Sequence, residues 1–420
     1  MITSSRVLAS TTSESKWRVA MVWALSLGLF IQLSGKIWLE STSARNAQVY
    51  IWLLAPALIY CVHKIISRSL RWPDWQYVPW LLYLLWVALS TLWATDADAG
   101  AWSLAKRGLF IGLYLMAIHC LMTQHQWLLR RALLTAVAVI ALSAAVSLVY
   151  QFGVLDRPLS FRGYRIDRLG IGNFANFGWP VAAGIFHGAV ATWALGVALD
   201  KRTRPALSLF WLAAFVALAG YVLLTYTRGA WIALAVCCIL IVVIQNSRRG
   251  WLVLAAVVLV ALVAIILSWD HLLLEVQRRQ LSGRAKIWEY FYAAMTDHWT
   301  IGYGLGTPFR FVWPNEVAIS PHAHSLYLQQ IYDSGIVSLA LMCAGLLGLT
   351  YKAWQLRSHP WVQLAFPALV FALIAMLTDV ERIFTRPGDY WTVFWLPVAV
   401  LLAVPSRRKT EDKPPVSDGR

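Results

Sequence analysis

Two histidines, His322 and His324, stand in the stretch PHAHSLYLQQ, where a long polar segment meets an apolar one. Imidazole has an ordinary pKa of about 6.5, so a neutral ring that can accept a proton is present at neutral pH. We therefore interpret His324 as a candidate general base; the alternative is a histidine that hydrogen-bonds to backbone at a helix start. His322 either orients a substrate or lies in the loop without a role. A metal site would need more ligands, and Glu316 and His298 are nearby in sequence.

Arginine is the second residue type that points to chemistry, because it is concentrated in several segments between apolar runs. Arg228 lies in the turn TYTRGA, and Arg284 lies in the polar stretch SGRAKIW. A guanidinium stays charged and directs two donors at phosphate oxygens, so fixed arginines can offset the charge of a leaving diphosphate. The alternatives are a lipid-boundary anchor for Arg228 and a solvated helix start for Arg284. The candidate substrate-binding residues besides His322, each of which could instead be a solvated charge or half of an ion pair, are Arg162, Arg165, Arg168, Arg382 and Asp389.

The elements that hold these residues must be membrane helices. Of the 420 residues, 59% are apolar and only 13% are charged, a composition that indicates an integral membrane protein and excludes an ordinary soluble domain. A membrane helix needs about 20 apolar residues, and the chain contains about twelve such runs, so the predicted fold is all-α and polytopic. The predicted spans are 17–34, 47–66, 77–94, 104–123, 127–150, 173–199, 206–226, 229–246, 250–269, 323–351, 361–379 and 390–404.

Loop charge predicts the orientation of these spans. The net charge of +16 is explained by basic loops on the cytoplasmic side, and no basic patch carries a nucleic-acid motif. Basic residues concentrate in alternate connections, which predicts that both termini are cytoplasmic. The predicted organisation is nine spans in 1–269, a long periplasmic loop in 270–322, three spans in 323–404 and a disordered cytoplasmic tail in 405–420.

The predicted periplasmic loop has structure of its own. Trp288, Phe291, Tyr292 and Met295 recur at the spacing of one helix face, which predicts an amphipathic helix that lies at the interface or caps a cavity. The stretch TIGYGLGTP follows, and without a preceding strand it is not a dinucleotide fingerprint. We interpret it as a flexible turn.

Taken together, these segments resemble the O-antigen ligase and polymerase superfamily of bacterial envelope enzymes. The resemblance is carried by LSGRAKIWEY, IGYGLG and HAHSLYLQQIYDSGIVSLALM, within residues 281–342. Ligases of this family share a sequence motif. It consists of His followed by a small polar residue, then any nine residues, Gly, any two residues and a small residue. His324, Ser325 and Gly335 match it, whereas Ser338 replaces the more usual Gly, Thr or Tyr. TYTRGAW and SGRAKIW are similar to the arginine-bearing segments of the family.

The resemblance implies a transferase of the bacterial inner membrane with its active site on the periplasmic side. It implies that a glycan passes from undecaprenyl diphosphate to a sugar of lipid A–core, without cofactor or metal. His324 would take the acceptor proton, Arg228 and Arg284 would hold the diphosphate, and direct displacement would invert the anomeric centre. The partners are then the lipid-linked donor, the lipid A–core acceptor and membrane lipids, with no nucleic acid.

Three alternatives stay open from the sequence. A polymerase of the same superfamily would join one lipid-linked repeat to another. A metal-dependent membrane glycosyltransferase would use Asp96 and Asp98 of the stretch TDAD, although two acids after an apolar run are usually a solvated turn. A non-catalytic transporter of lipid-linked glycan would be expected to contain paired broken helices, which the sequence does not show.

Overall fold

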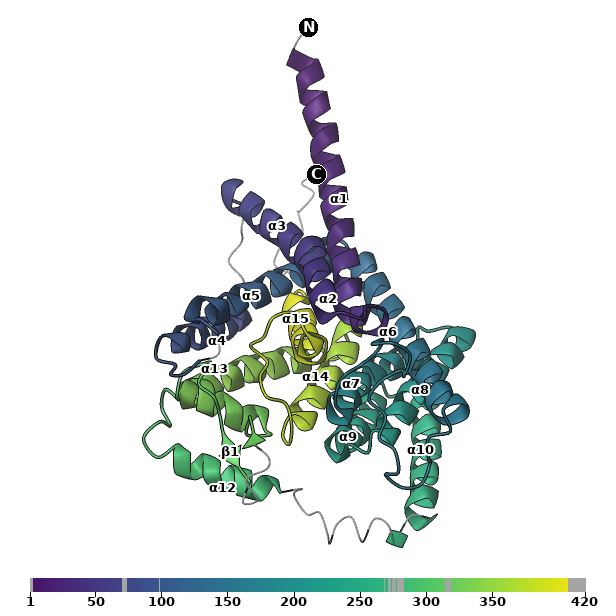
Figure 1. The fold of residues 1–420 in the computed structure, drawn as a ribbon. Coiled ribbons are helices and arrows are strands. Elements are labelled where there is room, and N and C mark those ends of the chain that lie inside the picture. The colour runs from purple at the N-terminus through teal and green to yellow at the C-terminus, as the bar shows by residue number, and fades with distance from the viewer. Residues whose placement is uncertain are drawn as a thin grey trace, which may run out of the picture.

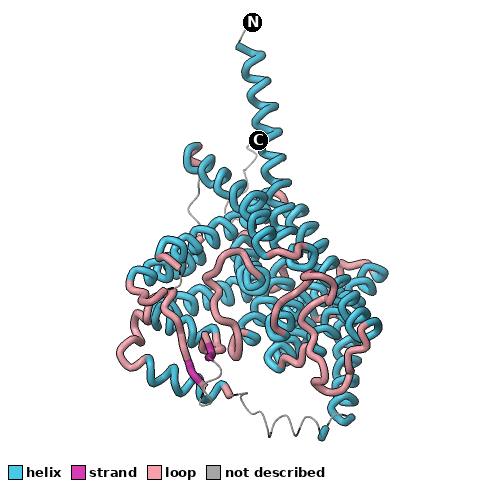
Figure 2. Tube along the Cα trace, viewed as in Figure 1, coloured by secondary structure: helices cyan, strands magenta, loops and turns pink. Residues whose placement is uncertain are grey.

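The computed structural model describes residues 3–69, 74–97, 99–267, 269–270, 273, 277, 283–313 and 319–406. In this part of the chain nearly all regular structure is helical, as Figure 2 shows. The one strand pair there is β1 (Phe311–Val312) with β2 (Ile319–Ser320), antiparallel with Phe311 opposite Ser320. The predicted all-α class is therefore confirmed.

The helices follow the apolar runs closely. In the first part of the chain they are α1 (Thr3–Trp38), α2 (Thr42–Val49), the π-helical turn η1 (Tyr50–Leu54), α3 (Ala55–Ile66), the 3₁₀ turn η2 (Trp75–Tyr77), α4 (Val78–Leu89), the 3₁₀ turn η3 (Ser90–Leu92), α5 (Ala101–Gln124), α6 (Gln126–Val149) and the π-helical turn η4 (Tyr150–Val154). After these come α7 (Pro180–Leu199), α8 (Pro205–Leu224), α9 (Arg228–Gln245), α10 (Arg248–Leu267), α12 (Arg284–Ala294), α13 (Leu326–Gln355), α14 (Pro360–Ala375), the π-helical turn η5 (Trp391–Trp395) and α15 (Leu396–Ala403).

Eight described helices are long and apolar enough to cross a membrane. They are Lys16–Trp38, Thr42–Ile66, Ala101–Gln124, Gln126–Val154, Pro180–Leu199, Pro205–Leu224, Arg228–Gln245 and Leu326–Gln355. The four remaining predicted spans fall on α4 with its flanking turns, on α10, on α14 and on η5 with α15. A multi-pass membrane protein is thus supported, whereas the count of twelve crossings, the division at 270–322 and the sidedness stay predictions. Of the predicted tail, residues 407–420 lie outside the described part.

Two predicted spans have wrong boundaries. The corrections concern the loop before α7 and the loop after α14, which both carry candidate site residues. The span predicted at 173–199 begins at Pro180, because proline suits the first helical position and Gly178 before it has a φ of +77°. The span predicted at 361–379 ends at Ala375. Asp379 therefore lies in a loop and not in a membrane helix.

Helix α7 is the centre of the bundle. All its residues from Ala183 to Leu199 are buried, and it packs against α8, α9 and α14. Close packing requires small residues: a Cβ added at Gly188 would lie 2.3 Å from the Phe371 ring of α14. Since α7 holds α9 and α14 side by side, the start of α9 and the end of α14 come to one end of the molecule (Figure 1).

Helix α13 is broken at Gly335, although the sequence predicts one continuous span. Gly335 has φ 72° and ψ 178°, a combination essentially restricted to glycine. The break releases the N–H of Ile336, which donates to the carbonyl of Trp299 at 2.8 Å. The freed carbonyl of Tyr332 accepts from the N–H of Tyr303 at 2.8 Å. The stretch TIGYGLG is thus bonded to the break.

The glycines of that stretch allow backbone to touch backbone. A Cβ at Gly302 would lie 2.6 Å from the backbone of Gly335, and one at Gly304 would lie 2.5 Å from the backbone of Ala94. Both glycines also have positive φ, 68° and 94°. The interpretation of this stretch as a flexible turn is therefore wrong, since it is a packed connection between the broken helix and the end of η3.

The predicted amphipathic helix exists as α12, which lies with β1 at the end of the molecule opposite the start of α1 (Figure 1). Its buried residues Ile287 and Phe291, together with Met295 after the helix, pack against a small cluster that includes Ala323 and Tyr332. One residue of the predicted face is wrong: Tyr292 is 57% exposed. The buried face runs through positions 287, 291 and 295, and Tyr292 lies about 100° further round the helix.

Candidate active site

Asp379 contacts two of the predicted catalytic side chains, His324 and Arg284. Its carboxylate accepts a hydrogen bond from Nη2 of Arg284 at 3.1 Å and faces Nδ1 of His324 at 3.7 Å. The backbone N–H of Val380 donates to the same carboxylate at 3.0 Å. Burial by itself raises the pKa of Asp379, but His324 and Arg284 outweigh it, so the pKa lies below its ordinary value. The carboxylate therefore stays ionised between a guanidinium and an imidazole.

His324 is held by its own backbone and by that of the preceding residue. Its φ is +51°, and its N–H donates to Nδ1 of His322 at 3.2 Å. The N–H of Ala323 donates to Oε1 of Gln329 at 2.9 Å, and the carbonyl of Ala323 accepts from the indole of Trp288 at 3.0 Å. Helices α12 and α13 thus both fix the loop that carries the histidine.

Arg228 reaches the same region from α9. It is the first residue of that helix and is partly buried. A Cβ added at its neighbour Gly229 would lie 2.9 Å from Oγ1 of Thr378, the residue before Asp379. The predicted catalytic set therefore converges after the end of α14, with His324 and Arg284 against Asp379 and with Gly229, the neighbour of Arg228, against Thr378.

Comparison with known proteins agrees with this arrangement. A family model described as O-antigen ligase covers residues 213–343, which include Arg228, Arg284 and His324. Residues 213–343 match the O-antigen ligase family. The chain is also 28% identical over 389 residues to the O-antigen ligase of Pseudomonas aeruginosa, a match that covers 92% of each chain. The resemblance to the O-antigen ligase family is thereby confirmed, and the match to the relative extends over most of the chain.

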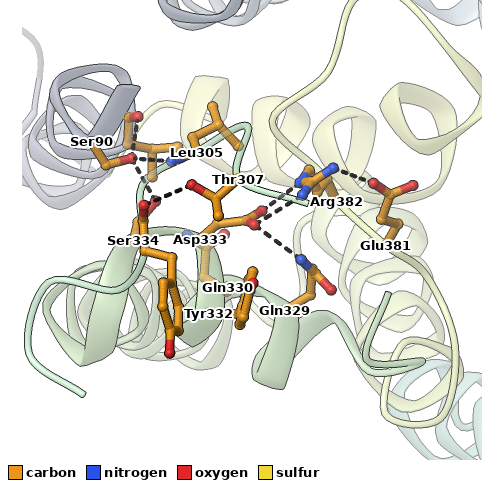
Figure 3. A network of polar contacts seen from close by, with 12 residues as sticks. Ser90, Leu305, Thr307, Gln329, Gln330, Tyr332, Asp333, Ser334, Glu381 and Arg382 are labelled. Atoms are coloured by element: carbon orange, nitrogen blue, oxygen red, sulfur yellow. Dashed lines mark hydrogen bonds and ion pairs between the residues drawn. The ribbon is translucent and has the colours of Figure 1, made fainter. Parts of the chain in front are cut away.

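Next to the group around Asp379 lies a second ionic group, drawn in Figure 3. Arg382 of the last loop makes a two-pronged bond to Asp333 of α13, with Nη2 3.0 Å from Oδ1, and also contacts Glu381. Burial by itself lowers the pKa of Arg382, but Asp333 raises it above its ordinary value. Nε2 of Gln329 donates to Asp333 at 3.0 Å, so Gln329 connects this ion pair to the loop of His324. These contacts favour the ion-pair alternative for Arg382 over substrate binding.

Breaking the ion pair between Arg382 and Asp333 should destabilise the fold. We expect Asp333→Asn to lower the free energy of unfolding by about 2–3 kcal/mol, since a buried pair loses one charge while Arg382 keeps Glu381. Urea or thermal unfolding in detergent measures the change. Asp156→Asn, at an exposed loop position with φ +48°, is the matched control and should be nearly neutral. Equal stability of the two variants would contradict the assignment.

Protonation of His322 should loosen the loop that carries His324. Burial first, and then the charge of His324, lower the pKa of His322, and its Nδ1 accepts the N–H of His324. In the unfolded chain His322 binds a proton near pH 6.5, whereas in the folded chain it binds one only at lower pH. The contribution of neutral His322 to the free energy of unfolding is therefore complete above about pH 6.5 and is lost as pH falls. His322→Asn keeps an acceptor without a titrating group. We expect its unfolding midpoint to fall less than that of the parent protein between about pH 7 and pH 5; parallel profiles would oppose this.

The other candidate arginines lie in the loop between η4 and α7, and Arg165 contacts the turn between α8 and α9. Nε of Arg165 donates to the carbonyl of Thr225 at 2.8 Å, three residues before Arg228. Arg168 forms a two-pronged ion pair with Asp167, at 2.8 and 2.9 Å. Arg162 has a φ of +60° in the same loop. The structure thus places one of the candidate substrate-binding arginines, Arg165, next to the turn that carries Arg228.

Asp389 belongs to a different contact. Its carboxylate accepts from Nη1 of Arg45 at 2.6 Å, which ties the last loop to α2. The predicted role in the substrate pocket has no support from this contact. Among the described residues no three His, Cys, Asp or Glu side chains converge as a metal site. Asp98 and Glu316 lie outside the described part, so the metal-dependent alternative is not tested.

Sequence reasoning missed Asp379, Asp333 and Gln329. One signal for Asp333 was present, because a carboxylate within an apolar run must be paired or functional. Asp379 gave no such signal, since it lies in a loop already rich in charge. Its importance arises only from the meeting of α12, α13 and α14.

Proposed function

We propose that this protein is an O-antigen ligase, which transfers a glycan from undecaprenyl diphosphate to a sugar of lipid A–core. The observation that carries the proposal is the Asp379 carboxylate with Arg284 on one side and His324 on the other. This arrangement combines a group that can take a proton with cations that can offset a diphosphate. The family match supports the class of reaction.

His324 would act as the general base through its Nε2 atom. Its Nδ1 faces Asp379, which favours the tautomer with the proton on Nδ1 and leaves Nε2 to accept the proton of the acceptor hydroxyl. The hydroxyl oxygen forms the new bond to the anomeric carbon as the bond to the diphosphate oxygen breaks. Asp379 remains ionised and stabilises the imidazolium that forms, the role of a buried carboxylate beside a catalytic histidine.

Arg284 and Arg228 would stabilise the departing diphosphate. Arg284 uses Nη2 for Asp379, while its Nε is buried and has no hydrogen-bond partner. A buried donor without a partner is costly, so a ligand oxygen at this position would relieve that cost. The start of α9 adds the positive end of a helix dipole beside Arg228. Direct displacement by the acceptor then inverts the anomeric centre.

The membrane arrangement proposed with this mechanism has both termini in the cytoplasm and the site on the periplasmic side of the inner membrane. The positive-inside distribution of loop charge supports it. The ligase assignment is favoured over a polymerase by the basic outer loops, which suit a phosphate-rich acceptor. Supplying purified protein and one donor with either lipid A–core or a second lipid-linked repeat separates the two. Product on the lipid-linked repeat alone would replace the ligase by a polymerase.

Asp379→Asn tests the mechanism without removing the base. We expect the turnover number for transfer to fall about 10²–10⁴-fold, since the imidazolium loses its counter-charge. Glu289→Gln, which removes an exposed charge from α12, is the control and should retain activity. A full turnover number in Asp379→Asn would refute the pairing.

A further inference from the structure

A basic cavity lies between the membrane helices far from the candidate active site. It has a volume of about 330 Å³ and is lined by residues of α1, α3 and α5 together with the turn after α3, among them Trp17, Arg18, Tyr60, His63, Lys64 and Gln124. This volume is within the range of about 300–1,000 Å³ that is usual for small-molecule sites. The cavity is separate from every residue of the proposed mechanism.

The lining of the cavity suits an anion. Arg18 and Lys64 supply cationic groups, and the described lining residues include no Asp or Glu. The Tyr60 hydroxyl accepts from Nε2 of Gln124 at 2.7 Å, and Nζ of Lys64 lies 5.7 Å from the centre of the Tyr60 ring. Trp17 packs edge-to-face on His63, with ring centres 5.3 Å apart. Five of the lining residues are therefore packed on one another in the wall, namely Tyr60, Lys64, Gln124, Trp17 and His63.

The cavity lies at the opposite membrane face from the site. Ser103, near the start of α5, accepts a hydrogen bond from Arg386 of the last loop, the loop that contains Asp379. Gln124, which lines the cavity, is the last residue of α5. The 21 helical steps from Ser103 to Gln124 span about 32 Å, roughly the thickness of the hydrocarbon core. In Figure 1 the end of α3 and the start of α1 lie accordingly away from α12.

An apolar face adjoins the cavity. Ile59, Val62 and Ile66 of α3 are 56%, 44% and 76% exposed and recur at the spacing of one helix face. In a membrane this face contacts acyl chains. An ion free in solution would use only the cations, whereas a lipid would use both the cations and this face.

We propose that the cavity binds the headgroup of an anionic glycerophospholipid from the leaflet opposite the active site. The phosphate lies between Arg18 and Lys64, and the acyl chains follow the exposed face of α3. Clustered basic residues at a membrane boundary attract such headgroups. The inference concerns a different part of the chain from the catalytic proposal and does not depend on it.

Native mass spectrometry of the full-length protein in detergent tests the proposal, with dioctanoyl-phosphatidylglycerol as the probe. Dioctanoyl-phosphatidylcholine and inorganic phosphate at equal ionic strength are the comparison ligands. The variant is the double substitution Arg18→Gln with Lys64→Gln. The control is Lys201→Gln with Arg202→Gln, two exposed residues between α7 and α8. The positive-inside rule predicts that they lie at the same membrane face.

We expect the parent protein to bind phosphatidylglycerol at least about tenfold more tightly than phosphatidylcholine. The reason is that each Lys or Arg near the membrane surface strengthens the binding of an anionic headgroup by a factor of this order. The cavity variant should lose this preference, and the control should keep it with an unchanged thermal unfolding midpoint. Equal preference in the cavity variant and the parent protein would overturn the site. Competition by inorganic phosphate as strong as that by the lipid would overturn the assignment to a lipid.

Discussion

His324→Ala is expected to lower the turnover number for glycan transfer by about 10²–10⁴-fold, the usual contribution of a positioned general base. The protein should still fold, because the backbone N–H of residue 324 keeps His322 as its acceptor and Ala323 keeps its contacts to Gln329 and Trp288. The Michaelis constant for the donor should change little, since Arg228 and Arg284 remain. A purified system with defined donor and acceptor measures both constants.

The choice of control makes this result specific. His298 lies before the TIGYGLG stretch and stacks on Tyr303, with ring centres 4.0 Å apart and an angle of 11° between the planes. His298→Ala removes an imidazole from the same outer region without touching Asp379. We expect it to retain most of the transfer activity. A His324→Ala protein that is correctly inserted and fully active would eliminate the proposed base.

Gly335→Ala is expected to have the largest effect on stability. The positive φ with extended ψ costs a residue with a side chain about 1–3 kcal/mol. The added Cβ would also lie 2.0 Å from the carbonyl oxygen of Thr300, and such overpacking typically costs a further 1–3 kcal/mol. We therefore expect a loss of about 2–6 kcal/mol in the free energy of unfolding, measured by denaturant titration in detergent.

The same substitution should also impair activity, for a structural reason. The break at Gly335 positions the first turns of α13, which carry Gln329 and Asp333 and thereby hold the loop of His324. Gly112→Ala is the matched control, because a Cβ there meets nothing within 4 Å and the position lies inside α5. Gly112→Ala should be neutral or slightly stabilising. Similar behaviour of the two variants would show that the break is not a steric requirement.

The sequence predicted the helical membrane fold because a long apolar run has few alternatives to a helix in lipid. It also predicted His324, Arg228 and Arg284 as a set, since their motifs are local and lie within the region that matches the O-antigen ligase family. The amphipathic helix α12 was predicted for the same reason, with Tyr292 assigned to the wrong edge of its buried face.

Other features required contacts between segments that are distant in the chain. Asp379 is 55 residues from His324 and 95 from Arg284, and no local pattern marks it as their common partner. Arg382 resembled the other outer arginines until its pairing with Asp333 was visible. The break in α13 was concealed because a glycine in an apolar run does not reveal its backbone conformation, and both its φ of 72° and the Thr300 backbone packed against it require a glycine there. Composition and periodicity therefore determined which segments are helices, whereas the packing of α7 against α9 and α14, and of α12 against α13, decided which side chains meet.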